Sequence, residues 1–258
     1  PPRSPPRSNR RQRQMCIRDR MGVGLDTIDV EACKARGIEV CPSIGANAVS
    51  VAEYVIATAM ILLRGPTYFA TPDVAAGAWD RPKFAGATEI AGRTMGIIGF
   101  GSIGQVVGAK ARGVGMEVIA YDAMMPDDHP AWADARRVSL DDLVAEADVI
   151  SLHCPKLPET IDLIDKRQFE RMKPEAVLVN SARGGIVNEA DCADALRSGQ
   201  IAGAALDTLD VEPITPEVGA LFQGIDNLIL TPHVAGVTKE SNRRIAEVAA
   251  ENVRRVLG

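Results

Sequence analysis

The sequence has few aromatic residues, no paired cysteine motif and no apolar run long enough to cross a membrane. Aromatic residues make up 4% of the 258 residues, beside 46% hydrophobic and 24% charged residues, as in ordinary soluble proteins. The five cysteines show no C-x-x-C spacing, which predicts reduced thiols in a cytoplasmic protein and neither a disulfide framework nor a metal site. The longest apolar run, residues 55–63 between Glu53 and Arg64, is too short for a bilayer, so we expect a buried helix there and no membrane contact.

Negative charge dominates the chain outside a basic stretch at its N-terminus. Residues 1–20 hold seven arginines against Asp19, a local charge of +6, so the net charge of −5 leaves −11 for the rest. This acidic body argues against a nucleic-acid surface. The basic stretch has the Pro/Arg/Ser/Gln composition of a disordered tail, with a nucleic-acid-binding arm as the alternative. No apolar segment follows its arginines, which disfavours a secretory signal.

Apolar strands alternate regularly with amphipathic helices after residue 92. Apolar, β-branched runs separated by helices are typical of a parallel sheet covered on both faces. Ser139, followed three residues later by Asp142, forms a helix-capping pattern. The sequence therefore predicts an α/β fold with a doubly wound parallel sheet. The expected strands are residues 94–100, 116–121, 148–154, 176–182, 202–207 and 227–232, and the expected helices include 47–64, 188–199, 239–257 and one that begins near 102.

The same patterns divide the chain into four parts. Residues 1–20 form the disordered tail, and residues 21–45 form a β/α unit that cannot bury its own faces and must pack on something else. Residues 46–236 form the main domain, which includes the apolar helix and an irregular Gly/Pro/Ala arm over 47–92. Residues 237–258 form a C-terminal amphipathic helix.

A glycine-rich turn lies at the end of the first strand of the main domain. Gly99-Phe-Gly101-Ser-Ile-Gly104 matches G-x-G-x-x-G and opens a helix, so Gly99 would permit the tight turn, Gly101 the approach of a pyrophosphate, and Gly104 close helix–strand packing. Asp122 ends the next strand, where a carboxylate accepts hydrogen bonds from the adenosine ribose and repels a 2′-phosphate. This pattern predicts NAD as the cofactor, in preference to NADP. A structural glycine turn, with Asp122 as a loop residue, is the alternative.

Three polar segments, NSARGG, LDTLDVEP and TPHVAG, each follow a later strand. Ligands bind beyond the carboxyl ends of strands in open parallel sheets, so Arg183, Glu212 and His233 are expected to converge there. Each residue alone has a structural alternative: a surface salt bridge for Arg183, a loop charge for Glu212, and a capped strand end for His233. His129 and His153 are expected to be structural.

Together the three side chains supply what hydride transfer to a 2-oxoacid requires. Arg183 offers a planar fork for a carboxylate and the adjacent carbonyl oxygen. His233 would give a proton to that oxygen during reduction and take it back during oxidation. Glu212 would pair with the imidazole, favour its protonated form and fix its orientation.

With these motifs the sequence resembles the D-isomer-specific 2-hydroxyacid dehydrogenases, a family that includes phosphoglycerate dehydrogenase and hydroxypyruvate reductase. The resemblance runs from Gly22 to the C-terminus and is closest to the sulfolactate dehydrogenase branch. It implies a Rossmann-type NAD-binding domain over 46–236, a remnant of a flavodoxin-like substrate domain before it, and a homodimer formed through the helix and arm over 47–92. The motifs that carry the resemblance, in family order, are GVGLDTID, VAEY, GFGSIG, HCPKLPET, VNSARGGIVNE, ALDTLDVEP and TPHVAG.

The resemblance also implies roles for individual residues. Arg183, Glu212 and His233 would be the substrate arginine, the pairing acid and the acid/base for a small 2-oxoacid or 2-hydroxyacid. The remaining implied positions are Ser102, Ile103 and Asp122 along the dinucleotide, Cys154, Ser181 and Asp207 near the ribose and nicotinamide, and Val23 and Gly24 presenting backbone N–H groups to the substrate carboxylate.

The sequence departs from the family pattern at several positions. Thr27, Asn188 and the pair Thr208-Leu209 replace the usual Asn, Asp and Val-Phe, and Lys156 replaces a Leu and would alter the cofactor rim. Residues 1–20 stand where family members carry most of a substrate domain, and we interpret them as translated adapter or vector sequence. The alternative function is therefore an NAD-binding fragment or an NAD-sensing regulatory module without turnover, whereas an alanine dehydrogenase is disfavoured because the three catalytic motifs fit it poorly.

Overall fold

The computed structural model describes residues 17–20, 24–25 and 28–257. Its contacts divide the chain into two units, one of residues Pro1–Asn47 with Val237–Gly258 and one of residues Ala48–Gly236. The larger unit is therefore one uninterrupted stretch, whereas the smaller unit joins the two ends of the chain.

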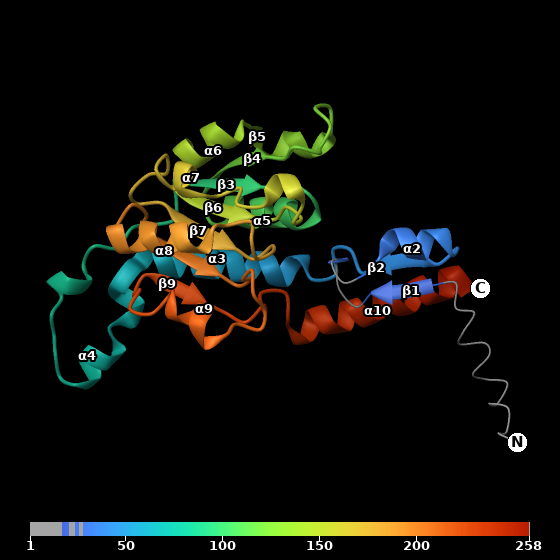
Figure 1. Ribbon diagram of the computed structural model, residues 1–258. Helices are drawn as coiled ribbons and strands as arrows, with labels where there is room; N and C mark the ends of the chain where they lie inside the picture. The colour runs from blue at the N-terminus through green and yellow to red at the C-terminus, as the bar shows by residue number, and fades with distance from the viewer. Residues whose placement is uncertain (1–16, 21–23, 26–27, 258) are drawn as a thin grey trace, which may run out of the picture. The chain divides into compact units, whose positions relative to one another are not determined.

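The larger unit is built on a seven-stranded parallel sheet with the order β5-β4-β3-β6-β7-β8-β9 (Figure 1). The chain runs from β3 outward to β5 and then returns to β6 on the other side of β3. The carboxyl ends of β3 and β6 thus form the switch point at which open α/β sheets bind their ligands. The strands are β3 Thr94–Ile98, β4 Glu117–Tyr121, β5 Arg136–Arg137, β6 Val149–Leu152, β7 Val177–Asn180, β8 Gly203–Leu206 and β9 Leu228–Leu230.

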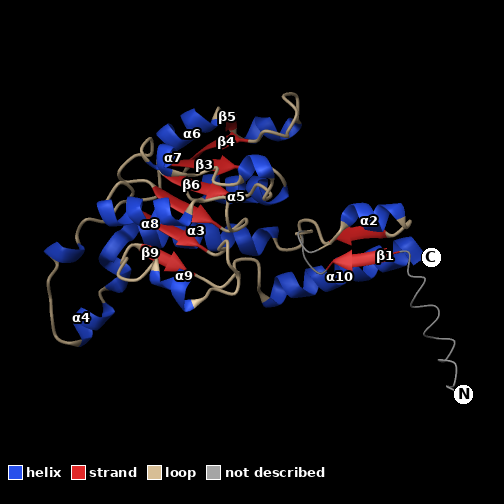
Figure 2. Cartoon of the chain, in the orientation of Figure 1, coloured by secondary structure: helices blue, strands red, loops and turns tan. Residues whose placement is uncertain are grey.

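Helices cover both faces of this sheet, which explains why its central strands are apolar throughout (Figure 2). Neighbouring residues of β3 point to opposite faces: Ile97 packs with residues of α3 and α5, and Ile98 packs with residues of α6 and α8. The predicted α/β fold with a doubly wound parallel sheet is thereby confirmed. The helices of the larger unit are α3 Ala48–Arg64, α4 Thr71–Ala75, α5 Ser102–Gly113, α6 Leu140–Glu146, α7 Lys166–Phe169, α8 Glu189–Ser198 and α9 Pro216–Ala220, with 3-10 turns η1 Gly65–Phe69, η2 Pro82–Phe84, η3 Pro130–Asp134 and η4 Pro158–Thr160.

Two local predictions for this unit have definite outcomes. The Ser139 hydroxyl accepts the N–H of Asp142 at the start of α6, as the capping pattern predicted. The arm after α3 is less irregular than expected, because it contains η1, α4 and η2. It leaves Tyr68, Phe69 and Trp79 exposed, with Trp79 at 79% of its full surface.

The smaller unit contains a two-stranded parallel sheet and two helices. Strand β1 (Ile17–Arg20) pairs with β2 (Glu39–Pro42), α2 (Val30–Ala35) is capped by Asp29, and α10 (Lys239–Leu257) packs against both strands. The Arg255 guanidinium lies 2.6 Å from the Glu39 carboxylate and connects α10 to β2.

The prediction that residues 1–20 lack regular structure is wrong for residues 17–20. The sequence IRDR has no apolar periodicity, but parallel pairing with β2 satisfies its backbone, and a non-local partner of this kind leaves no pattern in the strand itself. Residues 1–16 lie outside the described residues, and the non-native origin of the stretch stays a prediction.

Across the described residues, no single helix is long and apolar enough to cross a membrane. Helix α3 and residues 67–75 together reach the length and hydropathy of a span, but they are bent by 88°. Ten of the 17 residues of α3 are buried within the larger unit, as expected for a core helix.

Candidate active site

The glycine-rich turn after β3 has the geometry that a pyrophosphate requires. Gly99 has φ +88°, and a side chain there would collide with the backbone of His153 and Cys154. A side chain at Gly104 would overlap the carbonyl of Gly99. Gly101 occupies the N-cap position of α5 and has no side chain to bond the first helical N–H groups. The space that a side chain at Gly101 would fill is open. The turn therefore presents uncapped N–H groups and free volume at a helix N-terminus, which suits an anionic phosphate.

Asp122 stands beside this turn at the end of β4. Its carboxylate accepts the N–H of Phe100 at 2.8 Å, and its other oxygen accepts the N–H groups of Met124 at 2.8 Å and Met125 at 3.0 Å. The side chain thus joins the glycine turn to the loop after β4. The Asp122 side chain is half-buried, and a carboxylate can accept more hydrogen bonds than these three.

Arg183 follows β7 in a tightly built loop. Asn180 fixes this loop, because its amide donates to the Arg183 carbonyl at 2.9 Å and its side-chain oxygen accepts the Ala182 N–H at 3.1 Å. A side chain at Gly184 would overlap the carbonyl of Leu209, so the loop after β7 lies directly against the loop that carries Glu212.

Glu212 and His233 form a hydrogen-bond contact between two loops. Oε2 of Glu212 lies 2.8 Å from Nδ1 of His233, and Oε1 accepts the Leu209 N–H at 2.9 Å. The His233 side chain remains 49% exposed, so its second nitrogen is open to a ligand. His233 has φ +55°, a conformation that few non-glycine residues adopt.

Asp207 holds the His233 loop in that conformation. It is 2% exposed, and its carboxylate accepts the N–H groups of Val234 at 2.8 Å and Ala235 at 2.9 Å. Its backbone carbonyl accepts the His233 N–H at 2.8 Å. The Thr231 hydroxyl also donates to this carboxylate, at 2.6 Å.

A further link to this loop comes from α3. The Tyr54 hydroxyl lies 2.8 Å from that of Thr231, which already donates to Asp207, so Tyr54 is the donor. Sequence reasoning missed both the anchoring by Asp207 and the link from Tyr54. Both follow from tertiary contacts between distant segments.

The remaining predicted cofactor residues lie around the same strand ends. Cys154 packs against the glycine turn, and burial raises the pKa of its thiol to about 11. The hydroxyls of Ser181 and Thr208 are buried without a hydrogen-bond partner among the described residues. Ser102 and Ile103 open α5 at the glycine turn.

The other two histidines are structural, as expected. His129 caps η3 by accepting the Ala131 N–H. Burial lowers the pKa of His153 to about 3, so that imidazole is neutral, with Nε2 2.8 Å from the Ser151 hydroxyl. Val23 lies outside the described residues, and Gly24 belongs to the smaller unit. Within the described part of the chain, no three His, Cys, Asp or Glu side chains gather closely enough to hold a metal ion.

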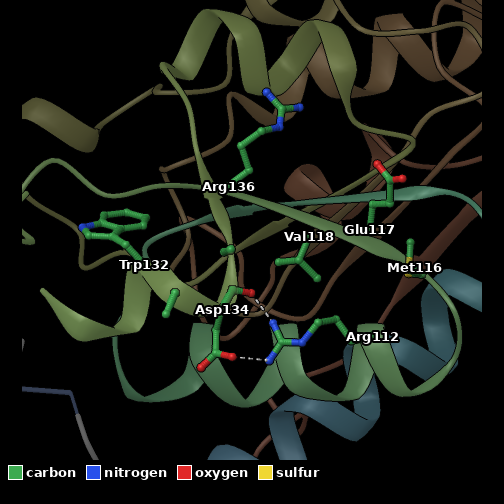
Figure 3. Close-up of a pocket in the computed structure, with 9 residues that line it drawn as sticks. Arg112, Met116, Glu117, Val118, Trp132, Asp134 and Arg136 are labelled. Carbon is green, nitrogen blue, oxygen red and sulfur yellow. Dashed lines mark hydrogen bonds and ion pairs between the residues drawn. The ribbon is translucent and has the colours of Figure 1, made fainter.

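A separate hollow of about 410 Å³ lies at the start of β4, the strand end opposite the glycine turn (Figure 3). Its two arginines are engaged, Arg112 with Asp134 and Arg136 with Glu146. This hollow therefore contributes nothing to the cluster at the carboxyl ends of the strands.

Comparison with known proteins identifies related sequences and folds. Residues 56–235 match the family model for the D-isomer specific 2-hydroxyacid dehydrogenase, NAD binding domain. The chain is 45% identical to (S)-sulfolactate dehydrogenase of Chromohalobacter salexigens over 93% of its length and 76% of that protein. It is 40% identical to D-3-phosphoglycerate dehydrogenase of Archaeoglobus fulgidus over 91% of its length, but spans only 44% of that relative. The crystal structure of D-lactate dehydrogenase with NAD+ from Lactobacillus jensenii aligns with a TM-score of 0.79 and 31% identity, covering 91% of this chain and 73% of that one.

Proposed function

Because this chain belongs to the D-isomer-specific 2-hydroxyacid dehydrogenase family and carries the family's NAD-binding domain, we propose that it interconverts a small 2-hydroxyacid and its 2-oxoacid. The observation that carries this proposal is the 2.8 Å contact between His233 and Glu212 at the carboxyl ends of the strands. An imidazole paired with a carboxylate and open at its second nitrogen is suited to move a proton to or from a substrate oxygen.

In this proposal the glycine turn and Asp122 hold NAD, which accepts or supplies the hydride when bound. The first N–H groups of α5, at Ser102 and Ile103, would bind the pyrophosphate, and Asp122 would accept hydrogen bonds from the adenosine ribose. The carboxylate of Asp122 would repel a 2′-phosphate, which favours NAD over NADP. Cys154, Ser181 and Asp207 would hold the ribose and nicotinamide end of the cofactor.

Arg183 binds the substrate carboxylate through its planar fork and orients the carbonyl next to it. During reduction of the 2-oxoacid, the protonated His233 gives the proton on Nε2 to the carbonyl oxygen and becomes neutral. During oxidation the neutral His233 takes the hydroxyl proton back. Glu212 holds the Nδ1 proton throughout, which keeps Nε2 directed toward the substrate.

The similarity to a sulfolactate dehydrogenase, at 45% identity, favours sulfopyruvate and sulfolactate as the substrate pair. Phosphoglycerate and hydroxypyruvate are the next candidates, since relatives with these names align over the same region.

The proposal also includes a homodimer. The arm after α3 exposes Tyr68, Phe69 and Trp79 close together in sequence, and a second copy of the chain would cover them. A monomeric mass in sedimentation equilibrium would contradict this assembly. The four described cysteines form no disulfide with one another, in keeping with a cytoplasmic location.

The test is NADH oxidation by the full chain with sulfopyruvate, hydroxypyruvate and glyoxylate, comparing His233→Ala with His129→Ala. We expect His233→Ala to lower kcat by about 10²–10⁴-fold, the usual contribution of general acid–base catalysis, and His129→Ala to leave it unchanged. NADH binding is followed in parallel by fluorescence. Binding without turnover of any substrate would contradict the dehydrogenase proposal and favour an NAD-binding or NAD-sensing module.

A further inference from the structure

The loops that follow β6, β7 and β8 meet at charged side chains outside the catalytic trio. Lys156 lies in the loop after β6, Glu189 opens α8 after β7, and Asp210 lies in the loop after β8. The Lys156 ammonium is 2.6 Å from Oδ1 of Asp210. The backbone N–H of Asp210 donates to Oε1 of Glu189, also at 2.6 Å. Asp210 is therefore held by its side chain from one loop and by its backbone from another.

The backbone beneath this ion pair is closely packed. A methyl group added at Gly185 would lie 2.7 Å from Oδ1 of Asp210 and 2.8 Å from Nζ of Lys156. The Lys156–Asp210 pair thus closes directly over Gly185. As a result, the loop after β8 is pinned against the loop that carries the substrate arginine.

The pinned segment leads directly to the catalytic pair. Leu209 precedes Asp210 and donates its N–H to Oε1 of Glu212 at 2.9 Å. The other oxygen of Glu212 contacts Nδ1 of His233 at 2.8 Å. A displacement of Asp210 therefore moves the N–H group that orients the Glu212 carboxylate.

The positive charge of Lys156 also reduces the repulsion among the neighbouring carboxylates. Burial raises the pKa of Glu189 and the hydrogen bond from the Asp210 N–H lowers it, while the negative charges of Asp210 and Glu212 raise it and the positive charge of Lys156 lowers it. Three carboxylates thus lie close enough to interact. Without the Lys156 ammonium, the three carboxylates repel one another with no positive charge between them. The Asp210 side chain, which is 57% exposed, can then move away into solvent.

We propose that Lys156 is a positioning residue: with Asp210 and Glu189 it forms a clasp that holds Glu212 against His233. This inference rests on the proposed acid–base role of that pair. Lys156 acts on it through the segment 209–212.

Histidine-selective ¹⁵N labelling tests the clasp without requiring turnover, because the chain has only three histidines. At about pH 9, above the ordinary pKa of histidine, long-range ¹H–¹⁵N spectra distinguish the two neutral tautomers of each imidazole. The bond to Glu212 keeps the hydrogen of His233 on Nδ1, whereas an unconstrained imidazole prefers Nε2. In the full chain, Lys156→Met is expected to shift part of the His233 population from the Nδ1–H pattern toward Nε2–H.

Lys110→Met is the matched control. It removes an ion pair with Glu53 at 3.0 Å whose lysine is 34% exposed, against 36% for Lys156, and it should leave His233 unchanged. Asp210→Asn removes the other half of the clasp and should reproduce the tautomer change, so it decides the outcome if Lys156→Met does not fold. Lys156→Arg should restore the Nδ1–H pattern. A wild-type His233 signal in folded Lys156→Met or Asp210→Asn would overturn the proposal.

Turnover gives an independent reading. We expect Lys156→Met to lower kcat by up to about fivefold, the rate equivalent of the ~1 kcal/mol that an exposed ion pair contributes, with little change in KM. A change in the His233 tautomer in a chain that turns over no 2-oxoacid would support the clasp and refute the proposed dehydrogenase activity. Turnover of a 2-oxoacid with an unchanged His233 tautomer in the variants would support the dehydrogenase activity and refute the clasp.

Discussion

Replacement of Asp207 by Asn is expected to destabilise the larger unit and loosen the His233 loop together. The buried carboxylate accepts three hydrogen bonds, from the Thr231 hydroxyl and from the N–H groups of Val234 and Ala235. An amide at this position keeps one oxygen but turns an NH₂ group toward one of these donors. At least one buried N–H then loses its acceptor, and the other bonds lose their ionic character.

An unsatisfied buried donor costs about 1–3 kcal/mol, and the loss of charge assistance adds to this, so we expect Asp207→Asn to lower the free energy of unfolding by roughly 2–4 kcal/mol. For a protein of this size that corresponds to a fall in Tm of about 4–16 °C. Amide hydrogen exchange at Val234 and Ala235 should accelerate in the same variant.

The control is Asp194→Asn, because Asp194 lies on the surface of α8 with its side chain 84% exposed. Its Tm should stay within about 1–2 °C of the wild type, as is usual for surface substitutions. The reasoning is refuted if Asp207→Asn unfolds at the wild-type temperature and its 234 and 235 amides exchange at the wild-type rate.

Three more outcomes are expected. Gly184→Ala places a methyl group against the Leu209 carbonyl. It should lower Tm by several degrees in thermal melts and raise the KM for the 2-oxoacid in steady-state kinetics. An unchanged Tm and KM would contradict the close packing of the two loops. Asp122→Ser should raise the NADPH/NADH preference in kcat/KM by at least about tenfold, and an unchanged ratio would refute the charge-repulsion argument. His153 is held neutral in the fold, its pKa lowered to about 3, so the unfolded chain binds a proton that the folded chain does not. The contribution of His153 to the free energy of unfolding is therefore complete above about pH 6.5. It is lost as the pH falls toward 3, by at most ~1.4 kcal/mol per pH unit. In urea titrations, His153→Gln should make the free energy of unfolding less dependent on pH in this range.

Strands that are buried on both faces were predictable from the sequence, because such strands must be apolar along their whole length. Strand β5 was not predicted, since a two-residue edge strand of Arg136 and Arg137 needs no apolar side chain. Strand β1 was missed for the related reason that its partner β2 is distant in the chain. The local pattern of apolar residues therefore identifies strands that are buried by their own side chains. It misses strands that form only because another strand pairs with their backbone.

The candidate site divides in the same way. The polar residues at the ends of strands were predictable, because parallel topology brings strand ends to one edge, and Glu212 and His233 do meet there. The contacts that hold them were not predictable. The bond from Tyr54 to Thr231 and the ion pair between Lys156 and Asp210 span 177 and 54 residues of sequence, and no spacing rule relates them.

The division of the chain into an uninterrupted larger unit and a smaller unit made from both chain ends sets an order of events during synthesis. Residues 48–236 leave the ribosome as a complete set of strands and helices and are able to fold as they emerge. Strands β1 and β2 precede the larger unit in the chain, whereas α10, which packs against both strands, follows it. These two strands therefore lack their covering helix until the whole larger unit has been synthesised, and an uncovered strand edge is a surface on which another chain can pair.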